Sequence, residues 1–267
     1  MAKVTQQTLV AIRFLYMYNI VFISAGALAA TSLLGSAIGL LVKRITHRAT
    51  DILLGFCAGM MLVASIVCLI MSAVGTCSLA GQWQVIAGIV CGVALIGVLD
   101  RLVPHVHSLS GIEQEPHAPS RSVSRVLLFT MAIAIHKFPE GLATGVAAQG
   151  IDSADAIAVT VAMALQNIPE GLIVVVPLLA IGVPPVRVVI MALTVAAIEV
   201  VGVLVGACLG SVSVAVLPMM LSLAGGAMLY VISDEMIPET HAHSHQRPAT
   251  YALIAGALLM LLIDKYF

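Results

Sequence analysis

Long apolar runs, separated by short polar stretches, form the dominant pattern of the sequence. Each run holds about 20 mainly apolar residues, which is the length an α-helix needs to cross a bilayer. The pattern predicts eight membrane-spanning helices with mostly brief connections, preceded by a short amphipathic lead-in of about a dozen residues. The expected spans are 17–42, 51–74, 84–103, 125–149, 154–180, 186–209, 213–233 and 249–266.

The predicted fold class is therefore all-α, a polytopic membrane helical bundle that forms a single integral-membrane domain over residues 1–267. Composition agrees, because 61% of the residues are hydrophobic and only 9% are charged, against roughly 25% charged in soluble domains. Spans of this length favour helices over the shorter strands of a barrel. The net charge of −1 and the lack of a basic run give no reason to expect a nucleic-acid partner.

Lysine and arginine predict the orientation of the chain, because cytoplasmic loops carry an excess of them. Two longer polar loops, at about 104–124 and 234–248, fall on the side that the basic residues favour. We therefore expect these loops to be cytoplasmic, both termini to be extracytoplasmic, and the protein to lie in the cell (inner) membrane. The basic residues on the favoured side are Lys43, Arg44, Arg48, Arg101, Arg121, Arg125, Arg187 and Arg247, whereas the other side has Lys3, Arg13 and Lys265.

One short polar pattern occurs twice inside these apolar runs. Residues 136–142 read His-Lys-Phe-Pro-Glu-Gly-Leu, and residues 166–172 read Gln-Asn-Ile-Pro-Glu-Gly-Leu. Residues four apart share a helix face, so His136 is expected over Glu140, and Gln166 over Glu170. Each Pro lacks an N–H and frees a main-chain carbonyl, and each Gly allows close backbone approach. Two such helices can present two half-sites to one ion.

The charges inside the spans need a partner. Glu199 stands alone in an apolar run and should turn toward the bundle interior. Unpaired, Glu140, Glu170, Glu199 and Lys137 would cost roughly 2.5–3.5 kcal/mol each, on the order of 10 kcal/mol together. Three carboxylates and one ammonium sum to −2, which one divalent cation would neutralise. Imidazole, carboxylate and amide donors suit Zn²⁺, with Fe²⁺, Mn²⁺, Co²⁺ and Cd²⁺ as competitors. The alternative is that Lys137 bridges the glutamates in an inert, packed cluster.

The paired Pro-Glu-Gly motifs, the acidic sixth span, and residues 233–241 (Ser-Asp-Glu-Met-Ile-Pro-Glu-Thr-His) resemble the ZIP (Zrt/Irt-like) metal transporters, particularly the bacterial members. The resemblance implies a secondary transporter that imports divalent metal, with zinc favoured, into the cytoplasm. It also implies elevator-type alternating access, in which the site-bearing helices move against a static set that can form a homodimer. The transport site would consist of His136, Glu140, Gln166 and Glu170.

The resemblance also implies a second metal site in two-metal relatives. Its positions here are Lys137, Asn167, Glu140, Glu170 and Glu199. Lys137 departs from the family pattern, in which Asn is usual, and a cation cannot ligate a cation. We therefore predict that the Lys137 ammonium takes the place of the second metal, forms ion pairs with the glutamates, and leaves a mononuclear site.

Polar residues near the expected cytoplasmic loops form two further candidate groups. The predicted role is metal exit or regulation, and the alternative is surface histidines that bind metal only weakly. The five cysteines have no CxxC spacing and are expected to be packing residues, with a thiolate metal site as the alternative. The first candidate group is Asp100, His105 and His107, and the second is Asp234, Glu235, Glu239, His241, His243 and His245.

Other functions on the same scaffold are a metal channel, a metal-sensing membrane protein, or a transporter that prefers iron, manganese or cadmium. A membrane metalloenzyme is disfavoured because the HExxH motif is absent. We expect no enzymatic activity and no cofactor beyond the transported ion, with that ion and the lipid bilayer as partners. Without a nucleotide-binding motif, the driving force would be the ion gradient, the membrane potential or proton exchange.

Overall fold

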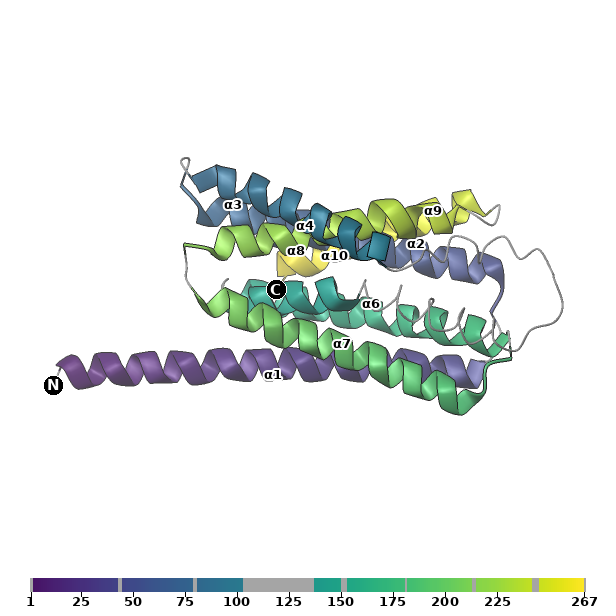
Figure 1. Cartoon of the computed structure of the whole chain (residues 1–267), viewed down its shortest axis with the longest axis horizontal. Helices are drawn as coiled ribbons and strands as arrows, with labels where there is room; N and C mark the ends of the chain where they lie inside the picture. The colour runs from purple at the N-terminus through teal and green to yellow at the C-terminus, as the bar shows by residue number, and fades with distance from the viewer. Residues whose placement is uncertain are drawn as a thin grey trace.

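The computed structural model describes residues 2–42, 45–78, 81–102, 137–149, 153–180, 182–212, 215–241 and 245–266. Every regular element in these ranges is helical (Figure 1). Residues 137–149 form the described part of the fourth predicted span. The other elements are α1 (Ala2–Val42), α2 (His47–Val63), the π-helix η1 (Ala64–Met71), α3 (Ser72–Thr76), α4 (Gln82–Leu102), α6 (Ser153–Ala180), α7 (Pro185–Val212), α8 (Leu217–Val231), the π-helix η4 (Ile232–Met236), α9 (Ile237–Thr240) and α10 (Gln246–Tyr266).

The all-helical, multi-pass architecture is confirmed. Six helical segments in the described ranges are long and apolar enough to cross a membrane, and Gln82–Val98 is a shorter apolar helix. Only residues 137–149 of the predicted fourth span, 125–149, fall among the described residues. The count of eight spans and the extracytoplasmic termini therefore stay predictions.

Two segments that were predicted outside the membrane spans are helical. The predicted lead-in is part of α1, which runs unbroken from Ala2 to Val42 because no Pro occurs in it and its first Gly is Gly26. The predicted loop at 234–248 is wrong over much of its length, since helix continues to Thr240 and α10 begins at Gln246. Ile232, Met236 and Thr240 are spaced four apart and all buried, so this polar stretch keeps one packed helix face.

The helices form two groups (Figure 1). In the first group, α2 packs on α10, and α4 packs on α8. In the second, α1 packs along both α6 and α7, and the 137–149 helix packs against α7. Contacts of α6 with α2 and α10 connect the two groups. We call them the α2–α10 group and the α1–α7 group.

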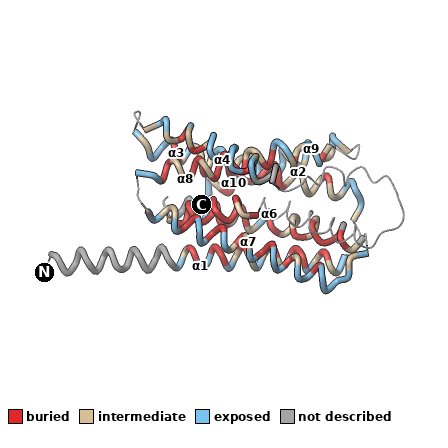
Figure 2. The backbone as a smooth tube through the Cα atoms, viewed as in Figure 1, coloured by how far each residue is buried: buried red, intermediate tan, exposed pale blue. Residues whose placement is uncertain are grey.

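Burial follows this arrangement, with buried residues between the helices and exposed ones on the outer sides (Figure 2). Large apolar side chains such as Leu41, Val186 and Tyr251 are more than two-thirds exposed, at 82%, 71% and 73%. In water such a surface would be unfavourable, but lipid covers it in a membrane.

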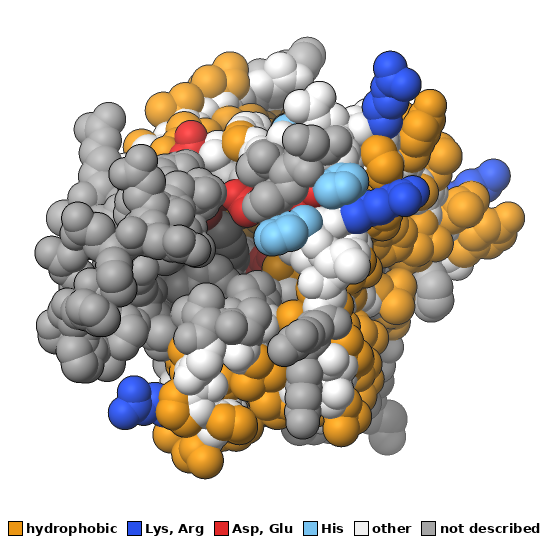
Figure 3. All heavy atoms as spheres, turned by 90° about the vertical axis from the view of Figure 1, so that its right-hand side faces the viewer, with side chains coloured by type: hydrophobic (Ala, Val, Ile, Leu, Met, Phe, Trp, Pro, Cys, Tyr) orange, Lys and Arg blue, Asp and Glu red, His pale blue; other side chains and the backbone are white. Residues whose placement is uncertain are grey.

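The helix ends gather at two opposite ends of the bundle. Thr46 caps α2 by accepting a hydrogen bond from the Ala49 N–H at 3.2 Å, and Gly182 makes the α6–α7 turn with a φ of 84°. Both turns lie at the same end as α9 (Figure 1). Figure 3 views this end and shows histidine, basic and acidic side chains together on it.

Candidate metal site in the membrane

A buried lysine lies at the centre of the polar cluster. Lys137, only 2% exposed, donates to Glu140 Oε2 and Asn167 Oδ1 at 2.5 Å each, and also to Glu170 Oε2. Its Nζ lies 3.9 Å from Glu199 Oε1. The predicted ion pairs of Lys137 with the glutamates are thus present, and they join both Pro-Glu-Gly motifs to the sixth predicted span.

Asn167 contacts both α7 and α1. Its Nδ2 donates to Glu199 Oε1 at 2.7 Å and to the main-chain carbonyl of Leu28 on α1 at 3.2 Å. Glu199 has no exposed surface, so it turns inward and finds a partner as the sequence predicts. The contact with Leu28 could not be predicted, because a main-chain carbonyl has no distinguishing sequence signal.

Glycines bring the helices close enough for these contacts. A Cβ at Gly141 would overlap the main-chain carbonyl of Glu199, so the 137–149 helix and α7 touch backbone to backbone. A Cβ at Gly171 would lie 2.6 Å from the Ser32 carbonyl oxygen, which brings α6 equally close to α1. The predicted role of the two motif glycines in close backbone approach is confirmed.

One oxygen of each of four polar side chains has no hydrogen-bond partner. Within the described part of the chain, these buried atoms are Glu140 Oε1, Gln166 Oε1, Glu170 Oε1 and Glu199 Oε2. A buried oxygen without a partner is costly, and such atoms commonly mark a functional site. Three of the four belong to the predicted transport site, so these residues have oxygens available for an ion.

The described residues by themselves do not assemble a ready metal site. Among them, no group of three or more His, Cys, Asp and Glu side chains is arranged to hold a metal ion. The Lys137 ammonium lies between the carboxylates instead. His136, the expected imidazole ligand, lies outside the described residues.

Two sulfur atoms flank Gln166. Its Nε2 donates to Met163 Sδ at 3.2 Å, and the Cys57 thiol on α2 donates to its main-chain carbonyl at 3.8 Å. Met163 lies three residues before Gln166, so helical spacing could have suggested it. Cys57 comes from a distant apolar run with no motif around it, and a packing role was expected over the alternative of a thiolate metal site.

The candidate exit residues are dispersed among the described ranges. The His241 ring contacts Thr240 Oγ1 and the Ile237 carbonyl within its own turn, at 2.9 and 2.8 Å. His245 Nδ1 lies 3.2 Å from Asp51 Oδ2 on α2, and Glu239 is exposed. His105, His107 and His243 lie outside the described residues, as does the side chain of Asp100. Their exit role stays a prediction.

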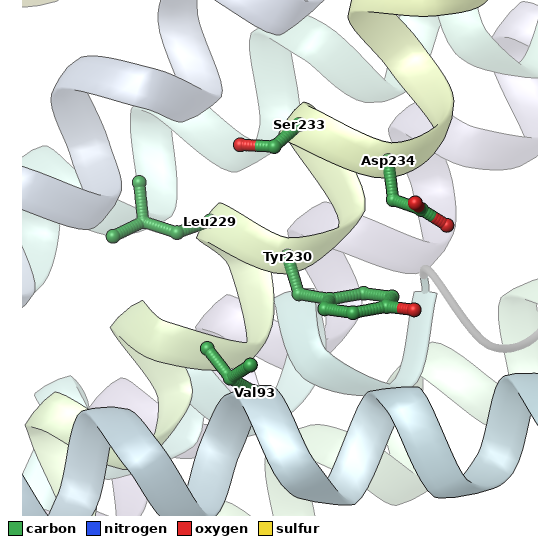
Figure 4. Close-up of a pocket in the computed structure, with 5 residues that line it drawn as sticks. All are labelled: Val93, Leu229, Tyr230, Ser233 and Asp234. Atoms are coloured by element: carbon green, nitrogen blue, oxygen red, sulfur yellow. The ribbon is translucent and has the colours of Figure 1, made fainter.

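A separate cavity of about 340 Å³ lies between α4 and the α8–η4 segment. It is lined by Val93, Leu229, Tyr230, Ser233 and Asp234 (Figure 4). None of the residues around Lys137 lines it, so this recess is distinct from the polar cluster.

Apolar helices that enclose a buried glutamate–lysine cluster are typical of a multi-pass membrane protein. A family model described as "ZIP Zinc transporter" matches residues 104–264. The chain therefore belongs to the ZIP family of metal transporters, as the sequence motifs predict. Members of this family are transporters and not enzymes.

Individual relatives agree with this assignment. "Zinc transporter ZIPB" of Bordetella bronchiseptica is 40% identical over 247 residues, which cover 90% of this chain and 78% of that protein. "Zinc transporter GufA" of Myxococcus xanthus is 40% identical over 181 residues, with coverage of 68% and 70%. "Zinc transporter ZupT" of Clostridium perfringens is 30% identical over 254 residues, with coverage of 85% and 88%.

Proposed function

We propose that this protein imports divalent metal ions into the cytoplasm, with zinc as the favoured substrate. The transport site consists of His136, Glu140, Gln166 and Glu170. The names of the three relatives, all zinc transporters, support zinc as the substrate. The direction follows from the family resemblance, and the driving force is the ion gradient, the membrane potential or proton exchange.

The main support for this proposal is that Glu140, Gln166 and Glu170 each have a buried oxygen without a hydrogen-bond partner in the described structure. Lys137 engages Oε2 of Glu140 and of Glu170, whereas Oε1 of both residues has no hydrogen-bond partner in the described structure. Gln166 Oε1 is likewise unpaired, and its side chain has no exposed surface. With the His136 imidazole, the three oxygens form a donor set of the kind that zinc accepts.

Lys137 limits the site to one metal ion. Its ammonium contacts Glu140, Glu170 and Asn167, which are three of the positions that form the second site in two-metal relatives. The fixed positive charge compensates part of the negative charge, and one divalent ion neutralises the remaining formal charge of −2. A second divalent ion would have to displace the ammonium from its partners.

The division of the helices into two groups supports elevator-type alternating access. The cluster is built on the α1–α7 group: Lys137 and Glu140 on the 137–149 helix, Asn167 on α6, Glu199 on α7, and the Leu28 carbonyl on α1. A set of helices joined by these contacts can carry the ion as one body. The α2–α10 group would provide the static part.

Competitive metal uptake in proteoliposomes tests the proposal. We expect saturable Zn²⁺ uptake by the wild type, competition by Cd²⁺, and loss of uptake in His136→Ala and Glu170→Ala. The matched control is His47→Ala, which, like His136→Ala, removes an imidazole but does so at an exposed position. Normal transport by both site variants would refute the assigned site, and non-saturable flux would favour a channel.

A further inference from the structure

Gln166 lies between two sulfur atoms. Met163 Sδ accepts a hydrogen bond from its Nε2 at 3.2 Å, and Cys57 Sγ lies 3.8 Å from its main-chain carbonyl oxygen. Because Nε2 is held by Met163, Oε1 is the end of the amide that is left for a cation. That oxygen is buried and unpaired.

Cys57 approaches the cluster from the other helix group. It lies on α2, has no exposed surface, and forms no disulfide. Its thiol donates to the main-chain carbonyl of Gln166, a residue of the proposed transport site. The thiol is therefore a neighbour of the proposed transport site that neither Pro-Glu-Gly motif supplies.

The donor atoms around this point favour a particular class of ion. Thiolate sulfur binds Zn²⁺ and Cd²⁺ well, whereas Mn²⁺ and Mg²⁺ prefer oxygen ligands alone. The unpaired Oε1 atoms of Glu140, Gln166 and Glu170 supply the oxygens, and Cys57 is the nearby sulfur on the opposite helix group.

We propose that Cys57 supplies a sulfur ligand to the transported ion and makes the site selective for thiophilic divalent cations, Zn²⁺ and Cd²⁺, over Mn²⁺. This inference rests on the proposed function, because it assumes that the ion binds at Glu140, Gln166 and Glu170. The thiol loses its proton when the metal–sulfur bond forms. The bound ion would then be held by both helix groups at once, and its release to the cytoplasm would break that bond.

X-ray absorption at the zinc edge tests the bond directly in the purified full-length protein loaded with Zn²⁺. We expect a sulfur neighbour at about 2.3 Å in the wild type. It should disappear in Cys57→Ser and persist in Cys91→Ser, a matched change at an exposed cysteine on α4. Met163→Leu should keep the sulfur neighbour. Persistence in Cys57→Ser, or loss only in Met163→Leu, would overturn the inference.

Uptake by the same variants in proteoliposomes tests selectivity. The ratio of Zn²⁺ to Mn²⁺ uptake should fall about tenfold in Cys57→Ser, which corresponds to about 1.4 kcal/mol, and stay unchanged in Cys91→Ser. Glu170→Ala distinguishes a failure of the proposed function from a failure of the proposed role of Cys57. If it transports Zn²⁺ normally, the proposed function fails. If it loses transport but Cys57→Ser keeps the wild-type ratio and its sulfur neighbour, only the role of Cys57 fails.

Discussion

Replacing Lys137 by Asn tests the proposal that Lys137 limits the transport site to one ion. The substitution removes the ammonium and releases Glu140 Oε2, Glu170 Oε2 and Asn167 Oδ1 from their hydrogen bonds. Removing one partner of a buried ion pair costs about 3–5 kcal/mol. We therefore expect the metal-free variant to be less stable than the wild type by about that amount.

Metal should reverse much of this loss. A ligand at 100 times its dissociation constant stabilises a folded protein by about 2.7 kcal/mol per site. With the ammonium gone, the freed oxygens can hold a second ion beside the first. Zn²⁺ should therefore stabilise Lys137→Asn more than the wild type, and the metal content should rise from one ion per chain to two.

The assay is elemental analysis after equilibrium dialysis, combined with thermal unfolding in detergent with and without Zn²⁺. Lys265→Asn is the matched control, because Lys265 is exposed in the last turn of α10. Two well-occupied ions in the wild type would refute the reasoning. So would a Lys137→Asn variant that still binds one ion.

Three further variants test the packing and the exit residues. Gly141→Ala places a methyl group against the main chain of α7. The variant should lose about 1–3 kcal/mol of stability in thermal unfolding and take up Zn²⁺ more slowly. Gly26→Ala, the control, adds a methyl group with nothing within 4 Å and should change neither property. Ser24→Ala removes a buried 2.8 Å hydrogen bond to a hydroxyl on α6 and should lower stability by about 0.6–1.7 kcal/mol; an unchanged unfolding temperature would contradict this. The double variant His241→Ala, His245→Ala should slow Zn²⁺ uptake less than about tenfold, because both rings already contact protein groups. Complete loss of uptake would show instead that these exit residues are essential.

The length of the apolar runs in the sequence predicted most of the fold. A chain in hydrocarbon must satisfy its backbone hydrogen bonds within each span, so apolar runs of this length become helices. The expected and observed ends of α6 and α7 differ by only a few residues. The polar segment before α10 was harder to predict, because its helix is maintained by one buried face at Ile232, Met236 and Thr240, which charged neighbours conceal.

The charged residues of the candidate site were predictable from the sequence. Lys137 and Glu199 could not stay unpaired at membrane depth, so their inward orientation and partners followed from energetic cost. The surroundings of Gln166 were less predictable. The contact of Cys57 with Gln166 joins residues 109 positions apart, and an isolated Cys in an apolar helix gives no periodic signal that such a contact exists.

The position of Asn167 has a consequence for how the protein is made. This residue accepts from Lys137 and donates to both Leu28 and Glu199. Of the four residues, Glu199 is the last to be synthesised. When ribosomal synthesis has reached only the end of α6, Lys137 and Asn167 are already in the chain, but their carboxylate partner on α7 is not. The network can close only after α7 has entered the bilayer. Closure of this network therefore cannot precede the insertion of α7, whereas α8 and α10 follow later in the chain.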